Sequence, residues 1–324
     1  MTEKQLTNLK TFIDNHDAFI IAGHKEPDGD CISSSLALAD LLKHYNKPTW
    51  LMNSGPFKRP EIKDFKKHFS TEFKQLTSNK SKTGLFIVDC SEIKRLGTIG
   101  QELVGLNTFI IDHHRTADAK PKTSIINPKA PATAYLIQQI FELNSVAISK
   151  KTAQTLFFGL CTDTGYFRYL DSTSADIFRA AARLIDAGAD PRKTYDFITS
   201  GKPFNTRKLL GIMLDRAKQY FDGKLIITYE TMEDTRKYAQ EGRDSDALYS
   251  ALLAIVGVEA VVFMRQETKE SCTVGLRSRD TVDVSAIATS FGGGGHKNAA
   301  GLSTQDKLKT LKPKIIEKFS KVFS

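Results

Sequence analysis

Acidic and imidazole side chains stand together in four short segments of the sequence. The segments lie at residues 23–30, at residue 89, at residues 112–114 and at residues 161–165. Their acidic and imidazole side chains of interest are His24, Asp28, Asp30, Asp89, Asp112, His113, His114 and Asp163. Carboxylates and imidazoles without thiolates suit Mn²⁺, Mg²⁺ or a mixed oxygen and nitrogen site. The residue types therefore indicate a divalent metal centre.

The number of these groups indicates what such a centre would do. Six Asp and His ligands are too many for one catalytic ion that must also keep a water molecule. They fit two ions about 3.5–4 Å apart with one carboxylate bridging them. Such a pair deprotonates a shared water molecule and clamps a phosphoryl oxygen. The pattern thus predicts hydrolysis of a phosphoester by in-line attack.

Each segment taken alone has a simpler interpretation. A lone His24 is typical of a structural loop histidine, and residues 27–30 are typical of a turn. Asp89 alone would serve as the N-cap of a following helix, and His113 with His114 as a satisfied pair at a strand end. Only the joint placement of the segments favours a site.

The elements that would position these side chains follow from the hydrophobic pattern. Apolar runs at 19–22, 85–88 and 108–111 are nearly continuous, as in buried parallel strands, and 48–52 reads as a further strand. Helical spacing of apolar residues predicts helices over about 31–45, 132–143, 150–160 and 174–187. This alternation predicts an α/β fold with a parallel sheet, and ligands bind such sheets beyond the carboxyl ends of the strands.

The second half of the chain has a different order of predicted helices and strands. Glycine and proline cluster between residues 188 and 203, which indicates a boundary there. A helix is predicted over 205–220, followed by strands at 224–229, 258–265 and 271–276. We therefore expect a catalytic metal-binding domain over 1–190, a linker with a helix over 191–215 and a smaller domain over 216–324.

Composition excludes several classes of protein. Of 324 residues, 40% are apolar and 26% are charged, which is ordinary for a globular chain. No apolar run approaches the roughly 20 residues of a membrane helix, and the polar first ten residues are no signal peptide. We expect a cytoplasmic location and no membrane partner. The net charge of +9 favours polyanionic partners, although lysine runs are typical of a solvated face.

The four cysteines form no CxxC pair, so a zinc ribbon or redox motif is not expected. In a reducing cytoplasm they would be free thiols. Cys31, Cys90 and Cys161 adjoin the predicted ligands. They would either fill small apolar spaces behind the site or make the site sensitive to thiol oxidation and thiophilic metals.

Four consecutive glycines at 292–295 precede His296-Lys297-Asn298-Ala299-Ala300-Gly301. Glycine lets backbone N–H groups approach a phosphate without interference from a Cβ, whereas the simpler alternative is a flexible linker. Together with the four acidic segments, this stretch resembles the DHH phosphoesterases that carry a DHHA1 domain. The motifs run from His24 to Gly301 and so cover nearly the whole chain.

The resemblance implies a fold and a role for each matching residue. It implies a parallel-sheet DHH domain with helices on both faces, a smaller α/β DHHA1 domain, and an active site in the cleft between them. One Mn²⁺ would be held by His24, Asp28 and Asp89. The second would be held by Asp30, Asp89, His113 and Asp163. His114 would act on the substrate phosphate, and Asp112 would orient the histidines. Substrate would be bound by Arg277, Ser278, Gly293, Gly294, Gly295 and His296. Arg279 is equally suited to clamp the phosphate.

Within the family, the chain looks closest to bacterial enzymes that degrade very short single-stranded RNA and dephosphorylate 3′-phosphoadenosine 5′-phosphate. Some relatives cleave linear dinucleotides made from cyclic di-AMP. Residues 159–169 and 186–191 carry this likeness, but the stretch 244–253 departs from it, where Ala-Leu replaces the usual Glu-Gly. A manganese pyrophosphatase or exopolyphosphatase is the alternative enzyme, and a nucleotide-binding regulator is the non-enzymatic one.

No element suited to duplex DNA is expected. The preferred substrate, the direction of degradation and the ranking of Mn²⁺ above Mg²⁺ or Co²⁺ are not readable from the sequence, and the resemblance allows a homodimer.

Overall fold

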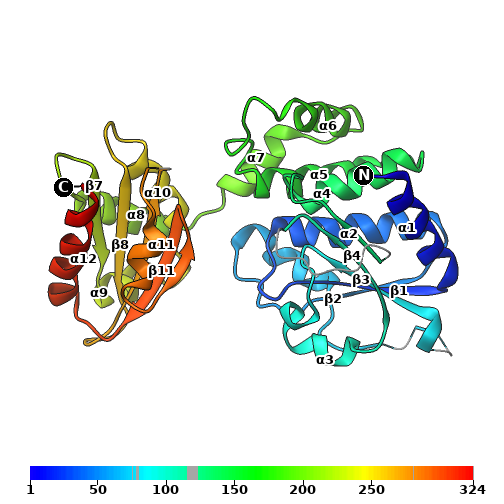
Figure 1. The fold of residues 1–324 in the computed structure, drawn as a ribbon, viewed down its shortest axis with the longest axis horizontal. Helices are drawn as coiled ribbons and strands as arrows, with labels where there is room; N and C mark the ends of the chain where they lie inside the picture. Colours follow the sequence, from blue (N-terminus) through cyan, green and yellow to red (C-terminus); the bar gives the residue numbers. More distant parts are fainter. Residues whose placement is uncertain (75, 78–79, 115–122, 280, 324) are drawn as a thin grey trace. The chain divides into compact units, whose positions relative to one another are not determined.

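The computed structural model describes residues 1–74, 76–77, 80–114, 123–279 and 281–323 (Figure 1). The chain divides into two compact units, residues 1–201 and 202–324. Helix α7 (Pro191–Thr199) belongs to the first unit and α8 (Phe204–Asp215) to the second. In the described part of the chain, no helix is long and apolar enough to cross a membrane.

The first unit is built on a five-stranded parallel sheet in the order β2-β1-β3-β4-β5. Its strands are β1 (Ala18–Gly23), β2 (Thr49–Met52), β3 (Thr83–Val88), β4 (Asn107–Asp112) and β5 (Ser124–Ile126). Its helices are α1 (Glu3–Asn15), α2 (Gly29–His44), α3 (Gly100–Leu103), α4 (Thr133–Leu143), α5 (Lys150–Asp163), α6 (Ala175–Asp186) and α7, with 3-10 turns η1 (Pro60–His68), η2 (Lys80–Lys82) and η3 (Ile93–Ile99). The parallel α/β fold class is confirmed.

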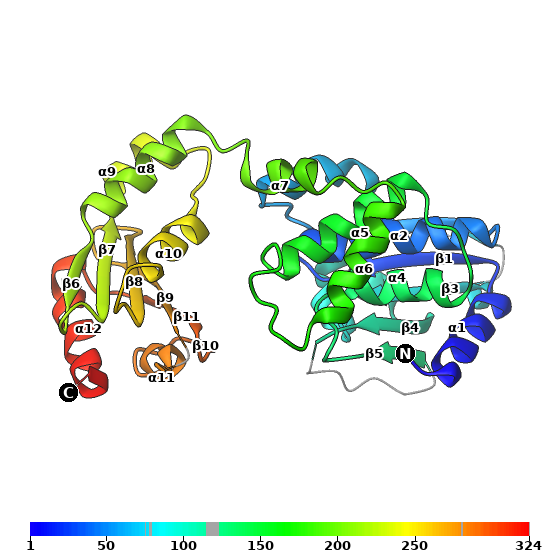
Figure 2. The same ribbon diagram turned by 90° about the horizontal axis from the view of Figure 1, so that it is seen from above.

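Helices cover both faces of this sheet: α2 and α4 lie on one of them, and α5 packs against both of these helices (Figure 2). Alternate strand residues serve the two faces because successive side chains of a strand point to opposite sides. Phe19 and Phe86 pack under α1, α2, α4 and α5, whereas Ile20 and Leu85 pack against η3 and α3. Since strands buried on both faces need apolar residues at every position, β1 and β3 appear in the sequence as continuous apolar runs.

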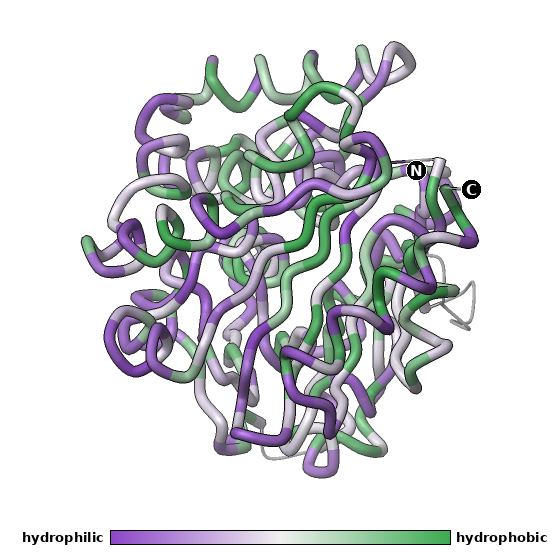
Figure 3. The backbone as a smooth tube through the Cα atoms, turned by 90° about the vertical axis from the view of Figure 1, so that its left-hand side faces the viewer, coloured by the Kyte–Doolittle hydropathy of each residue, from purple (hydrophilic) through white to green (hydrophobic). Residues whose placement is uncertain are grey.

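The second unit holds a mixed six-stranded sheet in the order β10-β11-β9-β8-β7-β6. Its strands are β6 (Lys218–Tyr220), β7 (Leu225–Glu230), β8 (Ala260–Gln266), β9 (Cys272–Ser278), β10 (Gly294–His296) and β11 (Ala299–Thr304). Its helices are α8, α9 (Met232–Tyr238), α10 (Ser245–Leu253), α11 (Val284–Thr289) and α12 (Leu308–Phe323). Hydrophobic stretches of the strands lie at the centre of this unit in Figure 3.

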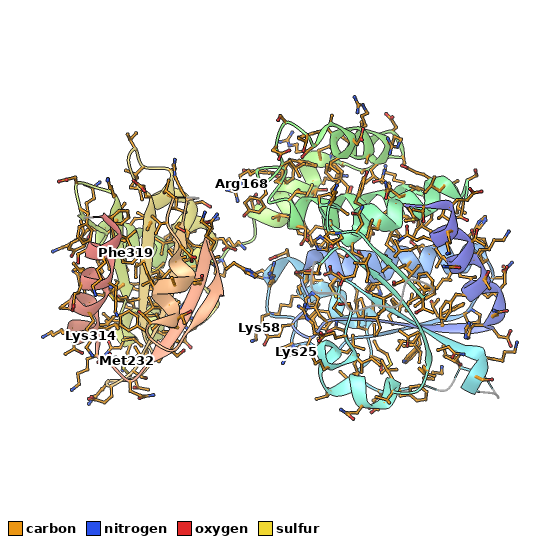
Figure 4. The ribbon with its side chains drawn as sticks, viewed as in Figure 1. Lys25, Lys58, Arg168, Met232, Lys314 and Phe319 are labelled. Atoms are coloured by element: carbon orange, nitrogen blue, oxygen red, sulfur yellow. The ribbon has the colours of Figure 1, made fainter. Side chains whose placement is uncertain are left out.

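Helices again lie on both faces of this sheet. Val262 and Leu276 face α11 and α12, and Phe319 of α12, labelled in Figure 4, is fully buried against them. Val261 and Phe263 face α8 and α10 instead. The predicted helix over 205–220 was wrong at its end: α8 ends at Asp215, because Lys218 to Tyr220 pair with β7 as an edge strand.

Gly159 marks where three helices of the first unit come close together. A Cβ at this residue of α5 would lie 2.7 Å from the Cβ of Ser33 in α2 and 2.9 Å from the Cβ of Ala134 in α4. We expect Gly159→Ala to destabilise the first unit by about 1–3 kcal/mol, the usual cost of overpacking. The sole tryptophan, Trp50, lies in this unit, so urea unfolding followed by its fluorescence measures the loss.

The matched control is Gly211→Ala in α8, where no atom of the described residues lies within 4 Å of the added Cβ. This variant should leave the Trp50 transition at the wild-type urea concentration. Equal midpoints for Gly159→Ala and wild type would contradict the close-packing interpretation.

Candidate metal centre

The candidate site lies at the carboxyl edge of the parallel sheet. His24 follows β1, Asp89 follows β3, and Asp112 ends β4. Since β1, β3 and β4 are neighbours in that order, the topology itself places Asp89 between the other two strand ends. Helices α2 and α5 complete the edge, because Asp30 lies in the first turn of α2 and Asp163 is the last residue of α5.

The structure brings all six predicted metal ligands together. His24 Nε2 lies 3.8 Å from Asp28 Oδ2 and 3.3 Å from Asp89 Oδ2. His113 Nε2 lies 4.0 Å from Asp30 Oδ2, 3.6 Å from Asp89 Oδ1 and 3.1 Å from Asp163 Oδ2. Asp89 thus faces both histidines, one with each carboxylate oxygen.

Asp89 also has an uncommon backbone conformation. Its φ of 59° lies in the left-handed region, which aspartate tolerates better than most residues. Its N–H still donates to the carbonyl of Ile111 in β4. Strained residues of this kind, at a cost of about 1–3 kcal/mol, cluster at functional sites.

Burial and charge set the protonation of the site. Burial lowers the pKa of His24, but the facing carboxylates of Asp28 and Asp89 outweigh it and raise the pKa to about 10. For His113, burial is likewise outweighed by Asp163 and Asp89, which raise its pKa to about 9. Burial and the charges of Asp89 and Asp163 hold the pKa of Asp30 well above its usual range.

These features fit a bound divalent cation. Three carboxylates, those of Asp30, Asp89 and Asp163, converge here, and no lysine or arginine pairs with them in the part of the chain that the structure describes. His113 Nε2 is buried and makes no well-aligned hydrogen bond to a described residue. Burial of several carboxylates carries a large desolvation cost, which a bound cation would relieve once the imidazoles give up their protons.

The groups that orient the ligands were only partly predicted. Asp112 Oδ1 accepts from His114 Nδ1 at 2.7 Å and from the His114 N–H at 3.0 Å, and these bonds outweigh burial and lower the pKa of Asp112. Asp112 therefore orients His114 but not the other two histidines. His113 Nδ1 instead contacts the carbonyl of Ala130 at 3.2 Å, and His24 Nδ1 that of Lys25 at 2.9 Å. Lys25 itself is labelled in Figure 4.

The start of α4 contributes contacts that the sequence analysis missed. The N–H groups of Thr133 and Ala134 donate to the two carboxylate oxygens of Asp30 at 2.6 and 2.8 Å. The Thr133 hydroxyl donates to Asp89 Oδ1 at 3.0 Å. A helix N-terminus favours negative charge, so α4 holds these two acids in place. A threonine at a predicted helix start was the available signal, but its partners are distant in sequence.

Thr133→Val tests this contact because it removes the hydroxyl and keeps the shape. We expect a loss of about 10–100-fold in activity or metal affinity, the usual effect of removing a group that orients a ligand. Steady-state hydrolysis and Mn²⁺ titration measure it. Thr133→Ser, which keeps the hydroxyl, should retain most of the wild-type value, and equal losses in both variants would contradict a role for the hydrogen bond.

The predicted substrate-binding residues lie in the second unit. Across β10, β11 and β9, His296 pairs with Ala299, and Ala299 pairs with Arg277. Directly paired residues of antiparallel strands share a face, so Arg277 and His296 flank Ala299 on one face of the sheet. The next row on that face is Gly294, Gly301 and Gly275. Gly294 and Gly301 therefore leave the backbone exposed between a guanidinium and an imidazole, whereas the Tyr249 hydroxyl occupies the space in front of Gly275.

Two neighbouring residues have other contacts. Ser278 is 8% exposed and its hydroxyl donates to the carbonyl of Val282 at 2.7 Å, so it braces the turn before α11. Arg279 donates to the carbonyl of Leu253 at 2.7 Å. Arg277 instead lies over the buried ring of Tyr249, 4.8 Å from its centroid. Of the two arginines, Arg277 is the one that shares a face with His296.

Two domain families match the chain. Residues 18–160 match the N-terminal domain of the DHH family, and residues 236–324 match the DHHA1 domain. The chain is 31% identical over 282 residues to the bifunctional oligoribonuclease and PAP phosphatase NrnA of Thermus thermophilus, covering 87% of this chain and 82% of that protein. The chain thus belongs to the DHH/DHHA1 family of metal-dependent phosphoesterases, and that prediction is confirmed.

Other relatives broaden the comparison. A probable manganese-dependent inorganic pyrophosphatase of Bacillus pumilus is 25% identical over 266 residues, covering 79% of this chain and 85% of its own. The crystal structure of an exopolyphosphatase-related protein from Bacteroides fragilis superimposes with a TM-score of 0.85 at 22% identity, covering 99% of this chain and 98% of that one. The similarity to the Bacteroides fragilis structure supports the fold alone.

Proposed function

We propose that this protein uses two divalent ions, with Mn²⁺ favoured, to hydrolyse very short single-stranded RNA to mononucleotides and 3′-phosphoadenosine 5′-phosphate to AMP. The observation that carries the proposal is the 31% identity to the Thermus thermophilus oligoribonuclease and PAP phosphatase, which extends over 87% of the chain. An alignment of that length includes residues of both units. The predicted ligands also lie together at one edge of the parallel sheet.

The same residues would hold the ions. His24, Asp28 and Asp89 would bind one, and Asp30, Asp89, His113 and Asp163 the other. When bound, the ions supply a water molecule of lowered pKa and positive charge for the phosphoryl oxygens. Asp89 faces both histidines, so its carboxylate would serve both ions. Asp30 and Asp89 are held rigid by α4 and would keep the ligand set preorganised.

His114 would act on the substrate through its outer nitrogen. Its Nδ1 lies 2.7 Å from the Asp112 carboxylate, whose lowered pKa keeps it charged. A charged acceptor there retains the proton on Nδ1 and leaves Nε2 for the substrate. The side chain is 37% exposed, which gives it access to solvent and ligand. In its doubly protonated form, His114 would donate from Nε2 to the phosphate or protonate the leaving oxygen.

The second unit would bind a substrate phosphate. Arg277 is suited to a bidentate contact, and the exposed Gly294 and Gly301 would let a phosphate approach the backbone without interference from a Cβ. Stacking of Arg277 on Tyr249 restricts the guanidinium to one direction. His296, across Ala299, would contact the same phosphate. The sequence prediction that both units act on one substrate is part of this proposal.

A comparison of three substrates tests the proposal. Purified protein in Mn²⁺ would be given a 5′-phosphorylated RNA dinucleotide, 3′-phosphoadenosine 5′-phosphate or pyrophosphate, with chelator-treated protein as the blank. We expect mononucleotide and inorganic phosphate from the first two substrates only. Hydrolysis of neither would contradict the proposed substrate class.

Pyrophosphate hydrolysis is the second candidate function. The Bacillus pumilus relative, at 25% identity over 79% of this chain, favours it. Turnover of pyrophosphate alone in the same experiment would establish this alternative. The glycine row and Arg277 would then need another role.

A further inference from the structure

The two sides of the candidate metal centre differ in whether a sulfur atom lies among the possible ligands. On one side Asp30, His113 and Asp163 offer only oxygen and nitrogen, and Asp89, His113 and His114 do the same. On the other side, the sulfur of Cys31 joins His24 and Asp89: the three ligand atoms lie within 4.8 Å of one another. Sulfur is a soft ligand that selects thiophilic metals over Mn²⁺ or Mg²⁺.

The fold directs the Cys31 sulfur to this position. Cys31 lies in the first turn of α2, where its N–H donates to the capping carboxylate of Asp28 at 3.1 Å. Its side chain is fully buried and occupies the space in front of Gly23, the last residue of β1. A Cβ on Gly23 would lie 2.2 Å from Cys31 Sγ. The sulfur is thus fixed beside the residue that precedes His24.

The other thiols do not share this arrangement. Cys90 follows Asp89 directly and Cys161 lies two residues before Asp163, yet neither sulfur belongs to a ligand cluster among the described residues. They pack instead in the two hydrophobic layers of the first unit. Proximity in sequence therefore does not by itself bring a thiol to the site, and Cys31 is the exception.

We propose that Cys31 is a ligand for thiophilic divalent ions, such as Cd²⁺ or Zn²⁺, at the His24 side of the centre. This inference rests on the proposed two-ion function and deepens it, because it gives the two ion positions different metal preferences. Sulfur and nitrogen ligands of one tetrahedral zinc are about 3.5 Å apart. A movement of the ligand atoms by about 1 Å would therefore bring them to the spacing that one ion needs. On binding, the Cys31 S–H bond breaks, its proton passes to solvent, and the thiolate sulfur bonds the ion.

Thiophilic ions are therefore expected to block the ion position beside His24. Manganese at this position needs only the oxygen and imidazole groups and leaves the thiol protonated. A thiophilic ion gains a thiolate bond that Mn²⁺ does not, so it would displace Mn²⁺ from the His24 side. The side formed by Asp30, His113 and Asp163 has no sulfur and would not discriminate in this way.

Cadmium titration of the whole protein tests the proposal without any activity measurement. A sulfur-to-cadmium charge-transfer absorption in the ultraviolet difference spectrum reports a thiolate ligand directly. We expect this band in wild type and in the matched control Cys90→Ala, and its absence in Cys31→Ala. Cadmium affinity of Cys31→Ala should fall at least about tenfold, since even outer groups of metal sites contribute that much.

Binding of Mn²⁺, followed by the electron paramagnetic resonance of the free ion, shows whether the variant keeps its site. If Cys31→Ala does not fold, Cys31→Ser provides the same test with an atom of similar size. Cadmium bound by wild type without the charge-transfer band would overturn the role of Cys31 and leave the proposed function intact. A protein that binds neither Mn²⁺ nor Cd²⁺ would instead remove the proposed metal centre, and this inference with it.

Discussion

Asp89→Asn is expected to lower phosphoesterase turnover by at least about a thousandfold while the protein stays folded. The carboxylate lies 3.3 Å from His24 and 3.6 Å from His113, so among the described residues it is the acid that faces both proposed ion positions. Charge stabilisation by a bound metal ion is worth several kcal/mol in the transition state. A difference of about 1.4 kcal/mol is a factor of ten in rate. Loss of the shared ligand removes most of that stabilisation.

Asparagine separates this effect from a loss of structure. Its amide oxygen can still accept a hydrogen bond, so the anchor from the Thr133 hydroxyl of α4 is kept. Hydrolysis of 3′-phosphoadenosine 5′-phosphate measures the activity, and thermal unfolding with and without Mn²⁺ measures ion binding, because a bound ion stabilises the folded state. The variant should unfold at the wild-type temperature without Mn²⁺ and gain little when Mn²⁺ is added.

Asp64→Asn is the control for this experiment, because Asp64 is an exposed carboxylate of η1 in the same unit. It should retain both turnover and the Mn²⁺-dependent rise in unfolding temperature. Substantial turnover in Asp89→Asn would mean that the reaction does not depend on a ligand shared by two ions.

The strands of the first unit were predictable because they are buried on both faces. The apolar runs at 19–22, 85–88 and 108–111 correspond to β1, β3 and β4 with small differences at the ends. Other elements escaped prediction. Strand β5 has only three residues, too few for a periodic signal, and α1 is mostly exposed, with a narrow buried stripe at Leu9, Phe12 and Ile13.

Helix α12 was not predicted from the sequence because its many lysines obscure the apolar residues between them. Its lysines read as a solvated face, and Lys309, Lys314 and Lys321 are indeed exposed. Leu311, Ile315 and Phe319, however, recur every fourth residue and are fully buried against the second sheet. Lys314 lies on the exposed side, where it pairs with Asp306 at 2.7 Å (Figure 4). The spacing of the apolar residues, rather than the charge, carried the information.

At the candidate site, the sequence could indicate side chains but not backbone partners. Strand ends carrying Asp or His are visible in a sequence because parallel strands end at one edge. The carbonyl of Ala130 and the N–H of Ala134 are invisible there, since every residue has such groups. Only the folded chain brings them to His113 and Asp30.

Binding of Mn²⁺ should strengthen by about tenfold for each ion position when the pH rises from 7 to 8, because an ion must displace one proton from each imidazole to reach the ring nitrogen. Without ions, the pKa of His24 is raised to about 10 and that of His113 to about 9, by the acids that face them. Both imidazoles are then protonated at neutral pH. Since protons compete with the ion below these pKa values, lower pH means weaker binding.

An ordinary histidine, with a pKa near 6.5, predicts a different outcome, because it is already mostly neutral at pH 7 and gives nearly constant affinity between pH 7 and 8. Titration calorimetry in buffers of different ionisation enthalpy counts the protons released, and we expect at least one for each ion. His68→Gln, at an exposed position of η1, should leave that count unchanged, whereas His113→Gln should lower it. Binding heats that do not depend on the buffer would mean that the imidazoles are neutral before the ions bind. The surrounding acids would then not keep the imidazoles protonated.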